Sequence, residues 1–281
     1  MYSCNCNYDN SFENNKSKMY IDPYGWDKIC YPNENLYPQP EEKYAWSWPT
    51  CFLKKDGDNF YTLSNKPLNF PIKEADLAFN FEKEFDYILN ISKHIRTKQI
   101  EVAKYWSYGP PIKQFIPIAD ILITTYKVTA CRAQRIQYIL NGALNDACAI
   151  CWHYKYKYNV IRPVQYNPLF KTIVNTPRHP SYPAGHSVLA GCMAAILSYF
   201  FPCEEEKIYN LALECSVSRL YAGVHYKADC DEGFKLGEFI GNSVIEMTNL
   251  DINNNHAQID YQYSDFKDAK IIPDTSRQYI K

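Results

Sequence analysis

The stretch RHPSYPAGHSV, residues 178–188, places two histidines, two prolines and a glycine directly before an apolar run. That run, from Ser187 to Phe201, is closed by Pro202 and is typical of a buried core helix. It is too short to span a bilayer. The start of such a helix offers free backbone N–H groups and the positive end of the helix dipole. The stretch therefore predicts a buried helix whose start is either an elaborate cap or a site for an anion.

The composition is that of an ordinary folded protein. The chain has 281 residues, of which 46% are hydrophobic and 22% charged, enough for one large domain or two small ones. A net charge of −1 argues against a nucleic-acid partner, which usually meets a strong basic excess. The first fifteen residues show neither the basic nor the apolar region of a secretory signal, so we expect a soluble, cytoplasmic protein without a membrane partner.

The eleven cysteines are an odd number, and without an export signal we expect reduced thiols. Two pairs, Cys4 with Cys6 and Cys148 with Cys151, have spacings found in metal sites, but neither is followed by a second pair at zinc-site spacing. The second pair lies in a helical pattern, where cysteine commonly acts as a small apolar residue. We therefore favour structural roles for both pairs over metal binding or redox chemistry.

The chain divides into three parts. Residues 1–72 are rich in Asn, Pro, Tyr and Trp, with one hairpin from Phe52 to Leu63 around an Asp-Gly turn. We expect this extension to wrap over the core, because Trp26, Trp46 and Trp48 would be unfavourable in free solution. Residues 73–250 follow helical periods, and residues 251–281 form a polar, loose tail. The fold class predicted is all-α, a helical bundle with an irregular N-terminal extension that contains a short β-hairpin.

Apolar spacing, glycines and prolines give the expected helices. One has Leu77, Phe81, Phe85, Ile88 and Leu89 on a single face, and the next covers 97–108 before Gly109. Pro117 opens a long segment to about Ile139, and Gly142 separates it from the run 143–158. The remaining helices are expected at 187–200, at 204–223 and from about Asp229 to Met247.

Three clusters of basic residues and histidines follow one another in the second half of the chain. The first is Lys155, six further residues and Arg162-Pro163, and the second is Pro-Ala-Gly-His at 183–186. The third is Ser218-Arg219, five residues, His225, three residues and Asp229. Each alone has an ordinary interpretation, as surface charges, a helix cap or a core histidine. Their joint order and spacing are improbable by chance.

The residue types suit a tetrahedral oxyanion. The two arginines carry planar forks that match oxyanion oxygens, and Gly185 would let the backbone approach a ligand closely. His225 and Asp229 are four residues apart, so on one helix the carboxylate could orient the imidazole as a nucleophile. His186 is then the candidate general acid or base on the other side of the anion. All of this requires three helices to be neighbours.

In this order and spacing the clusters resemble the signature of the type 2 phosphatidic acid phosphatase and vanadium haloperoxidase superfamily. The runs IEVAKYWSYGP and ALNDACAICWHYKYKYNVIRP further resemble the bacterial vanadium-dependent haloperoxidase branch. The resemblance covers roughly Ile95 to Ile245. It implies a helical-bundle core that holds phosphate or vanadate, two isosteric oxyanions.

By matching positions, the resemblance implies that Lys155, Arg162 and Arg219 bind the oxyanion oxygens, assisted by the Gly185 N–H. His225 would bond the central atom, as the nucleophile of a phosphatase or as the axial ligand of vanadium in a haloperoxidase. Asp229 would orient His225, and His186 would be the acid–base group.

Two positions modulate the pattern. The family motif usually has Ser where this chain has Ala184, so one hydrogen bond to the oxyanion, worth about 1.5–3 kcal/mol, is missing. His179 stands where bromide-selective haloperoxidases have a histidine, which favours bromide or iodide, although an ordinary loop histidine is the alternative.

The first functional interpretation is a vanadate-dependent haloperoxidase that oxidises bromide or iodide with hydrogen peroxide. The alternatives are a soluble acid phosphatase that acts on a phosphomonoester through a phosphohistidine, and an impaired family member with a binding or structural role. The aromatic extension would suit an interface between copies of the chain.

Overall fold

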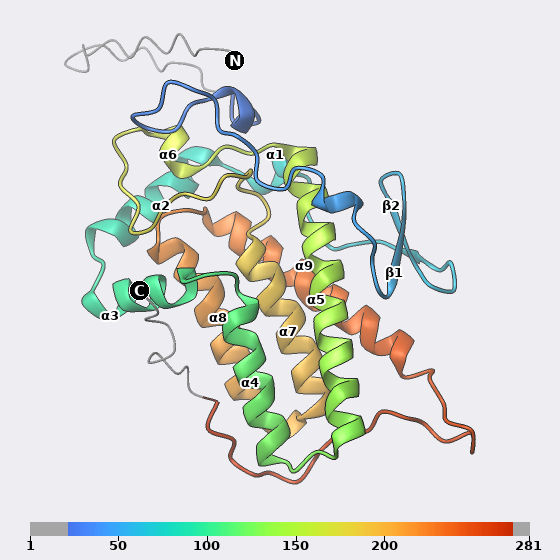
Figure 1. Ribbon diagram of the computed structural model, residues 1–281. Helices are drawn as coiled ribbons and strands as arrows, with labels where there is room; N and C mark the ends of the chain where they lie inside the picture. Colours follow the sequence, from blue (N-terminus) through green and yellow to red (C-terminus); the bar gives the residue numbers. More distant parts are fainter. Residues whose placement is uncertain (1–21, 272–281) are drawn as a thin grey trace, which may run out of the picture.

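The computed structural model describes residues 22–271, and helices dominate it (Figure 1). The expectation of an all-α bundle with an N-terminal hairpin is confirmed. The predictions made for Cys4 and Cys6 lie outside the described residues. No helix among residues 22–271 is both long and apolar enough to cross a membrane.

Nine α-helices follow the N-terminal region among the described residues. In chain order they are α1 Ala75–Ala78, α2 Phe81–Lys93, α3 Thr97–Ser107, α4 Ile112–Thr125, α5 Ala130–Tyr158, α6 Pro163–Tyr166, α7 Gly185–Phe200, α8 Glu205–Tyr221 and α9 Lys227–Thr248. Short 3-10 turns lie at Trp26–Lys28, Ala45–Ser47 and Pro202–Glu204.

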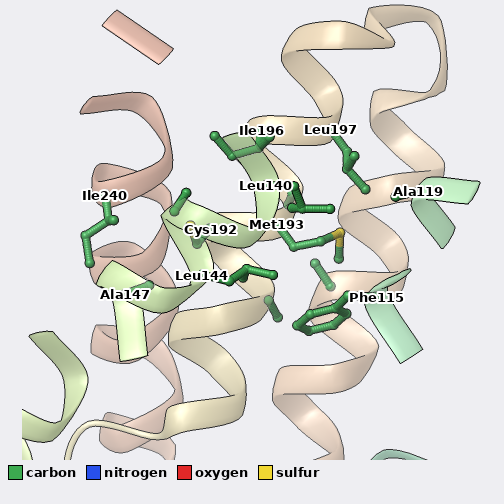
Figure 2. Packing of buried hydrophobic residues seen from close by; sticks show 14 of the residues in the cluster. Phe115, Ala119, Leu140, Leu144, Ala147, Cys192, Met193, Ile196, Leu197 and Ile240 are labelled. Carbon is green, nitrogen blue, oxygen red and sulfur yellow. The ribbon is translucent and has the colours of Figure 1, made fainter. Parts of the chain in front are cut away.

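The apolar run that follows residue 186 forms the centre of the bundle. Helix α7 packs against α5, α8 and α9, and nearly all of its side chains are buried. Figure 2 shows the core that results, with residues from α4, α5, α7 and α9 meeting around Met193 and Cys192. A helix that is apolar on all sides has to be surrounded, so this one sequence feature fixes the arrangement of its neighbours.

Helices α7 and α9 share the most extensive interface of the bundle, and glycine makes it close. Gly233, Gly237 and Gly241 recur every four residues on one face of α9. A methyl group at Gly233 would lie 2.9 Å from the carbonyl oxygen of Ala184, and one at Gly241 would lie 2.9 Å from that of Cys192. The two backbones are thus in direct contact, which fixes the start of α7 against the start of α9.

Helix boundaries differ from the expectation at two places. Pro117 lies inside α4, which begins five residues earlier at Ile112, so this proline does not open the helix and leaves the Lys113 carbonyl without its i+4 N–H donor. Gly142 does not separate two segments, since α5 is continuous through it. A methyl group at Gly142 would lie 2.6 Å from Cε2 of Phe52. Because glycine has no side chain, Phe52 of the N-terminal region can pack directly on α5.

The first helical face also differs from the expectation. The chain is extended at Phe79, between α1 and α2, so the predicted single face is divided between two helices. Phe85 and Ile88 are buried as expected, whereas Leu77 is 77% exposed.

The hairpin is confirmed and gains a strand. Strands β1 (Leu53–Asp56) and β2 (Asn59–Thr62) pair antiparallel, with Leu53 opposite Thr62, and β3 (Pro67–Leu68) adds to β2. The buried carboxylate of Asp146 on α5 attaches the hairpin to the bundle. It accepts hydrogen bonds from the backbone N–H groups of Cys51, Phe52 and Leu53 at 2.6, 2.8 and 3.0 Å.

Residues 22–48, which we call the N-terminal strap, cover the end of the bundle that also holds α6 (Figure 1). The Trp26 N–H donates to Asn159, and the Ile161 N–H donates to Pro23. Trp26 is buried as predicted, whereas Trp48 is 52% exposed. The strap therefore covers the segment that contains Arg162.

The tail after α9 is attached to the core, in contrast to the loose segment expected. The Asp260 carboxylate pairs with Arg135 at 2.8 Å, and the Ala269 N–H donates to the buried carboxylate of Glu204. Ala269 and Ile271 are buried. Two buried apolar side chains and two buried carboxylates hold this polar sequence along the end of the bundle opposite the strap (Figure 1).

Eight cysteines of the described region are unpaired, and Cys151 belongs to the hydrophobic core as expected for a small apolar residue. Cys30 is disulfide-bonded, so the expectation that all thiols are reduced was wrong at this position.

Gly237→Ala tests the glycine contact between α7 and α9. The added methyl group would meet the carbonyl carbon of Val188 at 2.8 Å, so the helices must separate, and we expect a loss of about 3 kcal/mol in the free energy of unfolding. Urea denaturation measures this. Asn242→Ala, at an exposed position of the same helix, should change the value by less than about 0.5 kcal/mol. Equal effects of the two substitutions would contradict the close packing.

Candidate active site

The three sequence clusters meet at one end of the bundle. Lys155 lies in the last turn of α5 and Arg219 in the last turn of α8, while Asp229 lies in the first turn of α9. Arg162 is the N-cap of α6, and Ala184 is the N-cap of α7. Helices α5 and α8 end where α7 and α9 begin, so positions far apart in sequence come together at the same end.

His225 is joined to Asp229 and Arg162 by its two ring nitrogens. Nδ1 lies 2.9 Å from Oδ2 of Asp229, and Nε2 lies 3.0 Å from Nη1 of Arg162. A guanidinium can only donate, so Nε2 accepts and the proton lies on Nδ1, where the carboxylate accepts it. His225 therefore carries its lone pair at Nε2, the atom that a nucleophile or an axial ligand would use once the Arg162 N–H releases it.

The predicted contact between His225 and Asp229 is confirmed, but the two residues do not share one helix. Tyr226 is the N-cap of α9, so His225 lies in the connection before the helix. Oδ2 of Asp229 also accepts from the Tyr226 N–H at 2.9 Å. The carboxylate thus caps the helix and orients the imidazole with the same oxygen.

Arg162 connects His225 to the loop that carries His179. Its Nε donates to the His179 carbonyl at 3.0 Å, its Nη1 donates to the Val224 carbonyl at 2.7 Å, and its Nη2 lies 3.0 Å from Nδ1 of His179. The His179 ring contacts the ring of Trp152, with centroids 4.8 Å apart. Most of the guanidinium donors are therefore used to hold the two histidines.

Lys155 is fully buried, and its ammonium group is saturated by one loop. Nζ donates to the carbonyls of Pro180, Ser181 and Pro183 at 2.9, 3.0 and 2.6 Å. An ammonium has three donors. Lys155 thus shapes the loop before α7 and contributes its charge to the site, while its direct contact with an oxyanion stays a prediction.

Arg219 and His186 are held by backbone carbonyls of α3. Nη2 of Arg219 donates to the Ala103 carbonyl at 3.1 Å, and Nε2 of His186 donates to the Trp106 carbonyl at 2.8 Å. The lone pair of His186 is therefore on Nδ1. Nη1 of Arg219 makes no hydrogen bond within residues 22–271 and is the donor most available to a ligand.

The start of α7 completes the site. The buried Ala184 offers no side-chain cap, and its own N–H donates to the Asp229 carbonyl at 2.9 Å. At Gly185 an added methyl group would face Trp152, Lys155 and Cys151 at 3.6–4.0 Å. The uncapped first turn, with its free N–H groups and positive dipole end, thus lies beside the cations.

The electrostatics favour an anion. Among the described residues none of Lys155, Arg162 and Arg219 forms an ion pair, and Asp229 is the one carboxylate in their network. Burial lowers the pKa of Lys155 to about 8 and that of Arg219 to about 10, so both are cations at neutral pH. Burial raises the pKa of Asp229 to about 6. Buried positive charge without a partner is costly, and a bound oxyanion would offset that cost.

The histidines of the site are neutral. Burial, together with Arg162 and Lys155, holds the pKa of His225 well below 6.5, and burial together with Arg219 does the same for His186. The pKa of His179 is also well below 6.5, through burial and the charges of Lys155 and Arg162. His186 therefore presents a basic lone pair.

Sequence reasoning missed three contributors. The carbonyls of α3 that hold Arg219 and His186 carry no residue-type signal. The hydroxyl of Ser181 donates to Oδ2 of Asp229 at 2.5 Å, and this serine lies inside the opening stretch, where its position between His179 and His186 could have indicated it. Trp152, which lies three residues before Lys155, contacts the ring of His179.

Comparison with known proteins agrees with the resemblance to the superfamily. The family model described as PAP2 superfamily matches residues 131–252, the region that carries all three clusters. This match confirms the resemblance to the superfamily that the clusters indicate. Solved structures with the same fold include a bacterial vanadium-dependent iodoperoxidase, with a TM-score of 0.61 and 23% identity over 82% of this chain and 62% of that one. A holo-type bacterial vanadium-dependent chloroperoxidase has a TM-score of 0.57 and 12% identity over 76% of this chain and 56% of that one.

Two relatives known by sequence have different activities. A non-specific acid phosphatase of Providencia stuartii is 29% identical over 111 residues, which cover 38% of this chain and 45% of the phosphatase. A vanadium-dependent bromoperoxidase of Corallina pilulifera is 30% identical over 107 residues, which cover 28% of this chain and 18% of that protein. The chain spans less than half the length of either relative.

Oxyanion binding should stabilise the fold. Because the buried cations lack an anionic partner, orthovanadate or inorganic phosphate at about 100 times its Kd should add about 2.7 kcal/mol to the free energy of unfolding. Thermal denaturation with and without each anion measures this. Arg219→Gln should remove most of the gain, whereas Arg132→Gln, in the first turn of α5 about 35 Å from Lys155, should retain it. If the anion stabilises the Arg219→Gln variant as much as the parent protein, the anion binds at another site.

Proposed function

We propose that the protein is a vanadate-dependent haloperoxidase that uses hydrogen peroxide to oxidise bromide or iodide. The observation that carries the proposal is the buried cation cluster around a neutral His225 whose Nε2 lone pair is held by Arg162. The net reaction consumes halide, hydrogen peroxide and a proton and yields hypohalous acid and water.

The donor set fits a tetrahedral oxyanion. Arg219 has free guanidinium N–H groups, the first turn of α7 has uncapped backbone N–H groups, and Lys155 and Arg162 supply positive charge. His225 would hold vanadate through Nε2. When bound, vanadate supplies a Lewis acid that activates hydrogen peroxide toward halide without changing its own oxidation state.

The other residues prepare the proton and halide steps. His186 has its Nε2 proton fixed on the Trp106 carbonyl, so Nδ1 is the atom that would take a proton from hydrogen peroxide and return it later. His179 and Trp152 are half-buried and lie beside Arg162, where a halide would meet a positive potential. A large, polarisable halide suits this ring-lined position.

A phosphatase is the second candidate, and the same lone pair supports it. Nε2 of His225 would attack the phosphorus of a phosphomonoester, the alcohol would leave with a proton from His186, and water would then release phosphate from the phosphohistidine. A neutral His186 cannot protonate a leaving group until it has gained a proton. The phosphatase route therefore requires that the charge of the bound phosphate first raises the pKa of His186.

An impaired protein that only binds is the third candidate. It is supported by Ala184, since a residue without a hydroxyl cannot add a side-chain hydrogen bond to the anion.

Two assays separate the candidates. The protein is incubated with orthovanadate, hydrogen peroxide and bromide while halogenation of a chromogenic dye is followed, and hydrolysis of p-nitrophenyl phosphate is tested in parallel without vanadate. We expect dye halogenation and no phosphate release, with the first activity abolished by His225→Ala. Phosphate release without halogenation would establish the phosphatase. No activity in either assay would support the protein that only binds.

Ala184→Ser tests whether the absent hydroxyl limits turnover. A hydroxyl at the N-cap of α7 would add a hydrogen bond to a charged ligand, so bromination should rise about tenfold. Ala184→Gly, which changes the N-cap without adding a hydroxyl, is the matched control. A rate that stays at the parent level in Ala184→Ser would show that the missing hydrogen bond is not limiting.

A further inference from the structure

Ser181 lies in the connection between α6 and α7 and is fully buried, and the proposed function gives it no role. Its Oγ donates to Oδ2 of Asp229 at 2.5 Å and lies 3.4 Å from Nδ1 of His225. The Nδ1 proton belongs to the same carboxylate oxygen, because Arg162 occupies Nε2. One hydroxyl therefore lies against both members of the His225–Asp229 pair.

The backbone on both sides of this hydroxyl is fixed. The Ser181 N–H donates to the Val160 carbonyl at 2.9 Å, and the Ser181 carbonyl accepts from Nζ of Lys155 at 3.0 Å. A side chain with a single rotatable heavy-atom bond on such a backbone has few alternative positions. The hydroxyl is thus a rigid part of the site.

Asp229 depends on this hydroxyl because it is held through one oxygen. Oδ2 accepts from Ser181, His225 and Tyr226, while Oδ1 has no partner among the described residues. The donors at 225 and 226 come from one segment, and Ser181 approaches from another. Without the hydroxyl, no donor from a second segment would resist rotation of the carboxylate about Cβ–Cγ.

We propose that Ser181 is a positioning residue, whose hydroxyl fixes the Asp229 carboxylate so that His225 keeps its proton on Nδ1 and its lone pair directed at the oxyanion. The inference rests on the role proposed for His225. Its first test needs no activity, so its failure can be told apart from failure of the proposed function.

The first test observes the ring nitrogens of His225 by NMR in protein labelled with 15N-histidine. His225→Gln identifies the signals by their loss. In the parent protein Nδ1 should be of the protonated type and Nε2 of the lone-pair type. Ser181→Ala should give a mixture of the two tautomers or broadened signals, and Ser181→Thr should restore the parent pattern.

Ser216→Ala is the matched control, because Ser216 is a buried serine whose hydroxyl bonds to the Ser187 hydroxyl on α7. Its spectrum at His225 should equal that of the parent. An unchanged His225 spectrum in Ser181→Ala would overturn the proposal, as would the same change in Ser216→Ala.

The second test uses whichever of the two activities the protein has. A hydrogen bond to a charged group is lost in Ser181→Ala, so kcat should fall about tenfold or more while KM changes little. Because Ser181 acts through Asp229, the double variant Ser181→Ala/Asp229→Asn should be no slower than Asp229→Asn alone. Losses that multiply in the double variant would show that Ser181 acts independently of the carboxylate.

Discussion

The structure depends on buried positive charge that the protein itself does not neutralise. Lys155 and Arg162 are fully shielded from water and Arg219 nearly so, and Asp229 is the one carboxylate in their network. Removing a charge from water without pairing it is among the largest costs in a folded protein. The fold bears this cost because backbone carbonyls from several segments solvate the cations. The carbonyls belong to α3, to the loop before α7 and to the connection before α9.

Those carbonyls come close to one another because the ends of the helices that carry or flank them meet at one end of the bundle. The glycine face of α9 brings the start of α7 against the start of α9, and the hydrogen bond from the Ala184 N–H to the Asp229 carbonyl joins the two starts directly. The positive ends of α7 and α9 therefore lie in one place with three cationic side chains, two of which sit on the negative ends of α5 and α8. Helix α7 is apolar and buried on all sides. The hydrophobic stabilisation from this burial offsets the cost of the buried charges at its start.

The sequence could predict the site residues that are recognisable from the type of their side chain. Lys155, Arg162, Arg219, His225 and Asp229 were found by type and spacing, and they meet as predicted. It could not reach the carbonyls of α3, because any residue supplies a carbonyl. It also misread Gly142 as a break, because glycine marks a helix end and a close approach of two chain segments equally well. The polar tail was expected to be loose because its few buried anchors, such as Ile271, have partners that only the tertiary structure supplies.

The neutrality of the histidines sets where protons lie in the site before an anion binds. Burial, together with the neighbouring cations, holds the pKa of each site histidine well below 6.5, so each would have to accept a proton before it could act as a general acid. In the proposed phosphatase route His186 would have to be protonated when the alcohol leaves, whereas in the proposed peroxidase route it would act first as the free base. Binding an oxyanion would oppose this field, because the added negative charge raises the pKa of nearby bases. The anion would thus turn His186 from a base into an acid, and the charge it carries at each step, rather than its central atom, sets the order in which protons move.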